Sequence, residues 1–284
     1  VLMLGDRSTP FVDACDYMNA LMMKLVDVVM AFAPYGVFFL IAKTFTEQGI
    51  GLFLPVLTYV LVLVGALLLH LFGTLMLFLK LFSGLDPFTF MKKIRPAQIF
   101  AFSTASSNAT IPVTLRCVTE RMGARNSVAS FTVPFGATIN MDGTAIMQGV
   151  ATVFLANVYG VDLGIGGYLT VIGMAVLASI GTAGVPGVGM IMLTMVLSQV
   201  GLPIEGIALI LGVDRLMDMI RTAVNITGDA VVSVIVAKTE GQLDMAVYAD
   251  PQAGLDEDDL QIDPTAEAEL ASHTHPPRRS RPAE

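Results

Sequence analysis

The stretch of 42 residues from Leu163 to Ile204 contains no Asp, Glu, Lys or Arg, yet it cannot form one regular membrane helix. A spanning helix needs roughly 17 to 25 residues. The centre of the stretch, SIGTAGVPGVG at residues 179–189, is too rich in glycine and contains a proline. The arms 163–178 and 190–204 would each be about 22 to 24 Å long, whereas the hydrocarbon core is roughly 30 Å thick. The pattern predicts a re-entrant hairpin that enters and leaves on one face of a bilayer.

A second apolar stretch is interrupted by STASSNATIP at residues 103–112. Basic residues stand on both sides of it, namely Lys92, Lys93, Arg95, Arg116, Arg121 and Arg125. Because Lys and Arg concentrate in cytoplasmic loops, both ends of this second hairpin are expected in the cytoplasm. The hairpin at 163–204 is flanked only by Asp162 and Glu205. The two hairpins are therefore predicted to enter from opposite faces.

The remaining chain also favours a membrane. Apolar residues make up 54% of it and charged residues only 14%, whereas soluble domains are about a quarter charged. Gly51 to Leu79 is uncharged over 29 residues, so one spanning helix is expected over 51–82 and another apolar helix over 11–46. His70 lies inside the first of these and is interpreted as a helix-packing residue. The fold class predicted is an all-α, multi-pass membrane protein.

Each hairpin is followed by a helix with polar residues in its interior, over 131–161 and 207–237. Interrupted apolar segments at matching places in two halves indicate a binding site near the middle of a secondary transporter. We interpret the two successive pairs of hairpin and polar helix as an inverted repeat.

The last helix carries a stripe of polar residues at spacings of 4, 3, 4 and 4: Asp214, Asp218, Arg221, Asn225 and Asp229. These spacings place all five on one helix face. An ionised group at the centre of a membrane helix costs about 2.5 to 3.5 kcal/mol on insertion scales, so the stripe should face a cavity or partner charges. A guanidinium can bind a carboxylate through two hydrogen bonds, and a carboxylate can bind an ammonium group. The ligand indicated is an amino acid with an additional acid; the alternative is an internal salt bridge between Asp218 and Arg221.

The sequence NMDGT, residues 140–144, interrupts an apolar helix with an amide, a carboxylate and a glycine. Unwound carbonyls and hard oxygen ligands suit a bare alkali cation such as sodium. The alternative is a kink that the glycine permits and that the amide and carboxylate cap.

The glycines at 181, 184, 187 and 189 allow backbone angles that other residues resist. This hairpin tip is predicted to close around a ligand, and the alternative is a simple turn between two helices.

The acidity of the chain is concentrated in residues 241–284, which hold ten acidic residues, three arginines and five prolines. This composition predicts a disordered tail. Cys15 and Cys117 indicate neither a disulfide framework nor a metal site. We expect no enzyme, because no nucleophile and base stand at a plausible spacing.

Four motifs, SSNATIP, GATINMDGT, SIGTAGVPG and DRLMDMIRTAVNITGD, occur in this order between Phe11 and Glu240. In these motifs the chain resembles the dicarboxylate/amino acid:cation symporters, which include the excitatory amino acid transporters. The resemblance implies a homotrimer in the cell membrane with a cytoplasmic C-terminus, working by an elevator movement, with no cofactor and no nucleic-acid partner. It divides the chain into a boundary segment at 1–10, two transmembrane helices at 11–90, a transport core at 91–240 and the tail. Only the C-terminal part of the family fold is represented, so the chain is interpreted as lacking upstream scaffold helices.

The resemblance also implies roles for individual residues. Arg221 resembles the residue that binds the substrate's side-chain carboxylate, and Asp218 resembles the one that binds its amino group. The substrate-binding residues implied are Ser107, Thr144, Val185, Gly189, Asp218, Arg221, Thr222 and Asn225. The sodium ligands implied are Gly136, Asn140, Asn225 and Asp229 for one site, Thr138, Met141, Ser179, Ile180 and Thr182 for a second, and Asn140 with Asp142 for a third that also draws on an upstream helix.

Three positions depart from the family pattern. Asn108 stands where many members have a serine, and neither Ala105 nor Met219 supplies an arginine that members carry at one of those places. Asp229 and the tip containing Thr182 resemble sodium-coupled members. The function implied is symport of glutamate or aspartate with sodium. The alternatives are a proton-coupled or C4-dicarboxylate symporter, a channel, or a fragment that is inactive without its upstream helices.

Overall fold

The computed structural model describes residues 53–255 and single residues scattered between Ala14 and Thr46. Across 53–255 the regular elements are all helical, and the one strand-like pairing there is an isolated bridge between Ala124 and Leu243. The elements are α2 (Phe53–Leu69), η3 (His70–Leu75), α3 (Met76–Ser83), α4 (Pro87–Thr104), α5 (Ser107–Arg116), η4 (Cys117–Arg121), α6 (Asn126–Ile139), α7 (Asp142–Val158), α8 (Gly164–Ile180), α9 (Val188–Gln199), η5 (Ile204–Gly206), α10 (Ile207–Thr239) and α11 (Met245–Ala249). The prediction of an all-α fold is confirmed for this part of the chain. The predicted segment 1–10, most of the helix at 11–46, and residues 256–284 lie outside the described residues.

Among the described residues, two helices are long and apolar enough to cross a membrane. The first, Leu54–Ser83, joins α2, η3 and α3 and confirms the helix expected over 51–82. It ends where Gly84 adopts a left-handed backbone with φ of 70°, a conformation that glycine adopts without strain. The second, Ile204–Thr239, contains α10.

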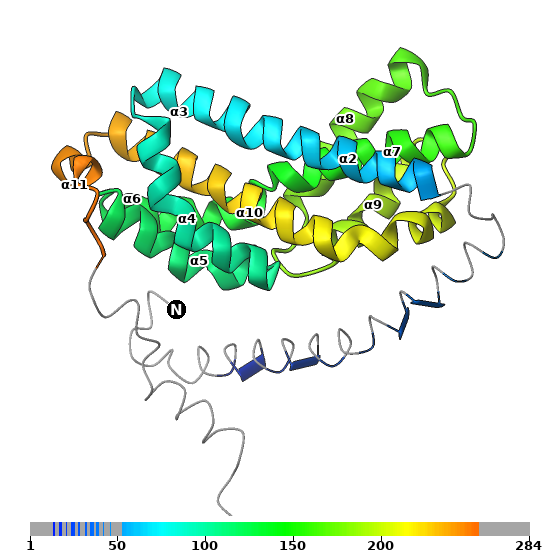
Figure 1. Ribbon diagram of the computed structural model, residues 1–284, viewed down its shortest axis with the longest axis horizontal. Coiled ribbons are helices and arrows are strands. Elements are labelled where there is room, and N and C mark those ends of the chain that lie inside the picture. The colour runs from blue at the N-terminus through cyan, green and yellow to red at the C-terminus, as the bar shows by residue number, and fades with distance from the viewer. Residues whose placement is uncertain are drawn as a thin grey trace, which may run out of the picture.

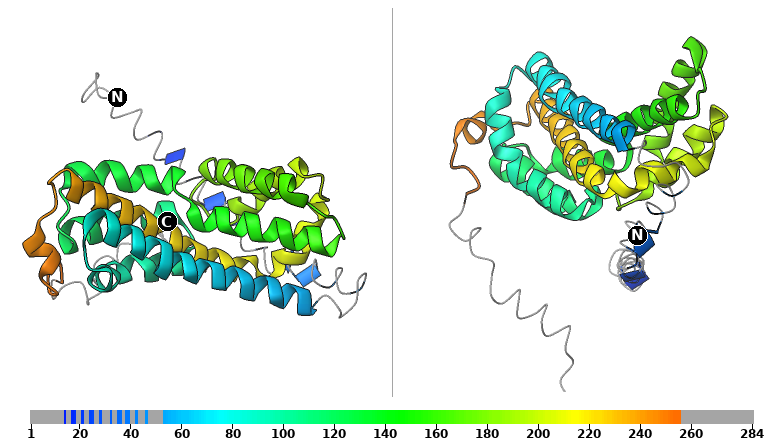
Figure 2. Two further views of the ribbon diagram at one scale, coloured as in Figure 1. Left: turned by 90° about the horizontal axis from the view of Figure 1, so that it is seen from above. Right: turned by 45° about the vertical axis from the view of Figure 1, so that its right-hand side comes forward.

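Helix α10 forms the centre of the molecule. It contacts α2, α3, α4, α5, α6, α7 and α9, and Figure 1 shows it running beneath the long α2–α3 helix. Most of α10 is buried, including the stripe residues Asp214, Asp218, Arg221 and Asp229, whereas most of Leu54–Ser83 is not. The polar stripe of α10 is therefore enclosed by protein, whereas α2–α3 lies along one side of the bundle (Figure 2). Apolar side chains of α2–α3 such as Leu61, Leu69 and Phe72 are exposed.

Helices α4 and α5 form the first helical hairpin. Its tip is shorter than the sequence suggests, because only Ala105 and Ser106 separate the two helices. Ala105 ends α4 with a left-handed backbone, φ 52°, and the Ser106 hydroxyl accepts a hydrogen bond from the backbone N–H of Ala109. The interruption predicted over 103–112 is thus too wide: a serine that looks like a helix breaker acts as the N-cap of the next helix.

Helices α8 and α9 form the second hairpin, with residues 181–187 as its tip. The tip lies close to the sequence prediction, and Gly187 has φ of 81°. The two tips meet at the carbonyl of Gly184. That carbonyl accepts hydrogen bonds from the Ser106 hydroxyl at 2.7 Å and from the Asn108 N–H at 3.1 Å.

The helix predicted over 131–161 consists of α6 and α7, which are separated at Asn140 and Met141. Both residues have ψ near 65°, outside the helical range. The break therefore lies within the NMDGT motif, as predicted.

Residues 241–255 are ordered, so the prediction of a disordered tail is wrong for this part. Asp244 caps α11 by accepting from the N–H groups of Ala246 and Val247. Tyr248 is 3% exposed and its hydroxyl donates to the Asp86 carbonyl at 3.0 Å. The Nζ of Lys93 donates to the carbonyl oxygens of Arg121, Val247 and Asp250. The prediction was based on the composition of all of 241–284, which does not show that Asp244 caps a helix and that Tyr248 is buried.

Candidate functional site

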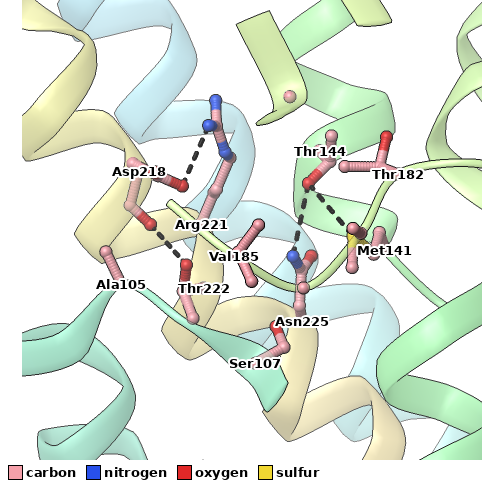
Figure 3. A pocket seen from close by; sticks show the side chains of 13 residues that line it. Ala105, Ser107, Met141, Thr144, Thr182, Val185, Asp218, Arg221, Thr222 and Asn225 are labelled. Atoms are coloured by element: carbon pink, nitrogen blue, oxygen red, sulfur yellow. Dashed lines mark hydrogen bonds and ion pairs between the residues drawn. The ribbon is translucent and has the colours of Figure 1, made fainter. Parts of the chain in front are cut away.

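The polar face of α10 lines a small pocket together with both hairpin tips and the start of α7 (Figure 3). All eight predicted substrate-binding residues line it: Ser107, Thr144, Val185, Gly189, Asp218, Arg221, Thr222 and Asn225. The remaining lining residues are Ala105, Met141, Thr182, Ala183 and Gly184. The cavity is only about 10 Å³ in volume, close to the space that one water molecule requires. A ligand of amino-acid size enters only if the tip or the side chains move.

Arg221 lies at the centre of the buried charges and is 2% exposed. Its Nη2 lies 2.9 Å from Oδ1 of Asp218, and its Nη1 lies 3.3 Å from Oδ1 of Asp214. The internal salt bridge considered as an alternative is therefore present, and Asp214 is a second partner. Both carboxylates lie on the same helix as Arg221, at i−3 and i−7, which are neighbouring positions on one face.

Asp218 also connects α10 to the second hairpin. Its Oδ2 accepts a hydrogen bond from the backbone N–H of Gly187 at 3.0 Å. In the same tip, a Cβ added to Gly189 would lie 3.0 Å from Nη2 of Arg221. The backbone of the second tip thus lies close to both Asp218 and Arg221. Figure 3 shows the loop that carries Val185 crossing the centre of the pocket.

Asn225 links α10 to α7 through both ends of its amide. Its Oδ1 accepts from the N–H of Gly143 at 2.7 Å, and its Nδ2 donates to the Thr144 hydroxyl at 3.3 Å. Gly143 permits this approach, because a Cβ there would lie 2.8 Å from the Arg221 carbonyl. The amide orientation is consequently fixed beside Arg221.

Three of the four residues predicted for the first sodium site come together at the end of α6. Asn140 Nδ2 donates to Asp229 Oδ1 at 3.0 Å, and a Cβ on Gly136 would lie 2.5 Å from the same Oδ1. The last carbonyls of a helix lack intrahelical partners and carry partial negative charge. The end of α6 and the Asp229 carboxylate therefore combine their negative potential at the break. The fourth residue, Asn225, lies one turn before Asp229 on α10.

The second predicted sodium set is not enclosed in one cluster. Met141 and Thr182 meet in the pocket lining. Thr138 is exposed, and its hydroxyl donates to the Pro134 carbonyl of its own helix. Ile180 is 44% exposed. The hydroxyl of Ser179, the remaining member of the set, donates to Val176.

Asp142, predicted for the third site, has a partner that the sequence did not reveal. Its Oδ2 lies 2.7 Å from Nε2 of His70, in the π-helical turn η3. The interpretation of His70 as a packing residue is wrong. Its partner is 72 positions away in sequence, so helical spacing could not indicate it; the signal available was an ionisable side chain inside an apolar span. Asp214 was placed in the polar stripe from sequence but without a specific partner, and the contact of Ser106 with the second tip was not foreseen.

The comparisons with known proteins decide the family. Residues 1–239 match the sodium:dicarboxylate symporter family. The chain belongs to this family. It is 35% identical over 242 residues to a proton/sodium-glutamate symport protein of Bacillus caldotenax, covering 85% of this chain and 57% of that protein. It is 40% identical over 235 residues to an excitatory amino acid transporter of Caenorhabditis elegans, covering 82% and 47%, and 39% identical over 236 residues to the mouse excitatory amino acid transporter 3, covering 83% and 45%.

Membership in the sodium:dicarboxylate symporter family agrees with the resemblance seen in the four motifs, and it makes the chain a membrane protein with two described helices of spanning length. The chain spans about half the length of these curated relatives.

Proposed function

We propose that the protein is a secondary active symporter that carries glutamate or aspartate across the cell membrane together with sodium. The observation that carries this proposal is the buried pair of Asp218 and Arg221, 2.9 Å apart, in a pocket closed by both hairpin tips. An acidic amino acid brings a carboxylate for Arg221 and an ammonium group for Asp218. It therefore gives each buried charge a new partner when it separates them.

The same reasoning disfavours a C4-dicarboxylate without an amine. Such a ligand would occupy Arg221 but leave Asp218 buried without a cation. Breaking a buried ion pair so that one charge is uncompensated costs about 3 to 5 kcal/mol. The amino group of the substrate avoids this cost, so an acidic amino acid is the better ligand.

Sodium is proposed as the coupled ion. Support comes from the break between α6 and α7, where the end of α6 meets Asn140 and Asp229. Hard oxygen ligands from carbonyls and carboxylates suit a small cation, and broken helices coordinate sodium in transporters. The predicted second site would need the exposed Thr138 and Ile180 to come together with Met141 and Thr182 as the tip closes further.

In this proposal the two hairpins are re-entrant, the protein is a homotrimer with a cytoplasmic C-terminus, and the transport core moves as an elevator. The contact of both tips at the Gly184 carbonyl supports a pocket that closes from two sides. A continuous pore would instead require an open path past these tips, which disfavours a channel.

The test is uptake by the full-length protein in liposomes. With an inward sodium gradient we expect glutamate or aspartate to accumulate, and uptake that is unaffected by removing sodium would refute the coupling. Current that persists without substrate and sodium would support a channel. Full-length protein that accumulates no acidic substrate under a sodium or a proton gradient refutes the symporter assignment itself.

Substrate class is tested by the charged pair. We expect Arg221→Cys to abolish binding of acidic amino acids while sparing neutral ones, because the side-chain carboxylate is the one group of the ligand that loses its partner. We expect Asp218→Asn to weaken the binding of amino acids more than the binding of succinate, because succinate has no ammonium group. Unchanged glutamate affinity in Arg221→Cys would remove the role assigned to that residue.

A further inference from the structure

His70 reaches from the long helix Leu54–Ser83 to the break between α6 and α7. Its Nε2 lies 2.7 Å from Oδ2 of Asp142, and the two side chains retain 20% and 17% of their exposed area. An ionised carboxylate can only accept hydrogen bonds. In the ionised form in which Asp142 would ligate sodium, Nε2 of His70 is therefore the donor, and the contact is largely shielded from solvent.

The Asp142 carboxylate is fixed on its other sides as well. Its Oδ1 accepts from the N–H of Gly143 at 2.8 Å. Its Oδ2 lies against α10 at Gly228, where an added Cβ would be only 2.7 Å away. The same Cβ position is 3.0 Å from Nδ2 of Asn140. Gly228 thus lets Asn140 and Asp142 approach α10 beside Asp229, and His70 adds a further contact to the same carboxylate oxygen.

The backbone around His70 is also unusual. His70 begins the π-helical turn His70–Leu75 inside an otherwise α-helical segment. Such turns are rare within α-helices and are frequent at functional sites. A residue that only fills space between two apolar helices requires neither this turn nor a buried carboxylate partner.

We propose that His70 is a positioning residue for cation binding: its Nε2–H holds the Asp142 carboxylate in the orientation in which that carboxylate ligates sodium. This inference rests on the proposed sodium symport. A ligating carboxylate that loses its hydrogen-bonding partner typically loses about 10- to 100-fold in metal affinity. The substrate pocket is held by other contacts, namely those of Arg221, Thr222 and Asn225, so the effect should fall on sodium and not on glutamate.

The experiment compares three variants of the full-length protein. His70→Leu fills the site without a donor. His70→Gln places an amide nitrogen at the distance of Nε2, whereas His70→Asn is one methylene shorter and cannot reach Oδ2. Sodium binding is measured as the sodium-dependent rise in thermal stability without glutamate. Glutamate half-saturation is then measured at saturating sodium.

We expect the sodium half-saturation to rise about tenfold in His70→Leu and His70→Asn and to stay within about twofold in His70→Gln. Glutamate half-saturation at saturating sodium should change less than about twofold in all three. If His70→Leu fails to fold, the Gln and Asn pair decides. Unchanged sodium binding in the Asn variant, equal loss in the Gln variant, or an equal loss of glutamate affinity would overturn the positioning role. A wild-type protein without any sodium response would instead refute the proposed sodium coupling.

Discussion

At the scale of single residues, two glycines are important because acidic side chains of neighbouring helices occupy the space that a Cβ atom would fill. Gly228 faces the Asp142 carboxylate, and Gly136 faces the Asp229 carboxylate. Each allows an acidic side chain to approach a neighbouring helix closely. The glycine positions therefore determine where the carboxylates of the proposed cation sites can lie.

Gly228→Ala tests this close packing. The new Cβ would lie 2.7 Å from Oδ2 of Asp142 and 3.0 Å from Nδ2 of Asn140, so one of the two helices must shift. Overpacking of this kind typically costs about 1 to 3 kcal/mol. We expect a lower melting temperature of the purified protein and weaker sodium-dependent stabilisation.

Gly149→Ala in α7 is the matched control, because nothing lies within 4 Å of the added Cβ. Replacing glycine by alanine inside a helix stabilises it by roughly 0.5 to 1 kcal/mol. The melting temperature of the Gly149→Ala variant should be unchanged or raised. Equal melting temperatures for the two variants would contradict the close contact at Gly228.

The order of residues along the chain revealed the polar face of α10 but not all of the residues that this face contacts. The spacing from Asp214 to Asp229 placed the polar stripe on one helix, and the structure confirms that α10 is continuous there. Helical periodicity reports only neighbours on the same helix. The bond between His70 and Asp142 joins two distant segments, so no spacing in the sequence could predict it.

At the scale of elements, the two hairpin tips are joined by two hydrogen bonds to one carbonyl oxygen. The Ser106 hydroxyl and the Asn108 N–H both donate to Gly184 O. The sequence predicted both tips but not their contact, because Ser106 was assigned to an interruption and not to a cap. The same hydroxyl accepts from the Ala109 N–H and donates to the opposite tip.

Ser106→Ala should release the second tip more often. A typical hydrogen bond contributes about 0.5 to 1.5 kcal/mol, which corresponds to a roughly 2- to 13-fold change in an opening equilibrium. The readout is the labelling rate of a cysteine introduced in place of Thr182, which lies in the same tip and is only 3% exposed while the tip is closed, after subtraction of the rate without that cysteine. We expect the rate to rise about 2- to 13-fold.

Ser103→Ala serves as the control, since the Ser103 hydroxyl is exposed and donates to the Ile99 carbonyl of its own helix. It should leave the labelling rate unchanged. If Ser103→Ala accelerates labelling as much as Ser106→Ala, the contact at Gly184 does not govern tip opening.

At the scale of the whole molecule, residues 241–255 form a strap that connects the end of α10 to the base of the first hairpin. The strap is held by Lys93 through the carbonyls of Val247 and Asp250, and by Tyr248 through the Asp86 carbonyl. A pairing between Arg125 N–H and the Gln242 carbonyl continues the contact. The strap thus adds to the direct packing of α10 against α4 and α5.

Lys93→Met should detach the strap. Methionine keeps much of the side-chain volume but donates nothing, so three carbonyls lose their donor, and each unsatisfied buried polar group costs about 1 to 3 kcal/mol. We expect limited chymotrypsin digestion to cut at Tyr248 far faster than in the wild type. Lys92→Met is the control, because Lys92 is exposed and lies over the Phe88 ring. Equal digestion of the two variants would show that Lys93 does not hold the strap.

Alkaline pH should loosen the same strap through Tyr248. Burial raises the pKa of the Tyr248 hydroxyl above its ordinary value, and the nearby Asp86 carboxylate raises that pKa further. The docked strap therefore keeps a proton that the released strap gives up from about pH 10. Its docking is at full strength below about pH 10 and weakens as the pH rises above that value.

Chymotrypsin cuts after Phe as well as Tyr, so digestion across this pH range can be compared with Tyr248→Phe, which has no ionisable group there. Since Lys93 also titrates in alkaline solution, the difference between wild type and Tyr248→Phe isolates the tyrosine, and parallel pH profiles would contradict its role.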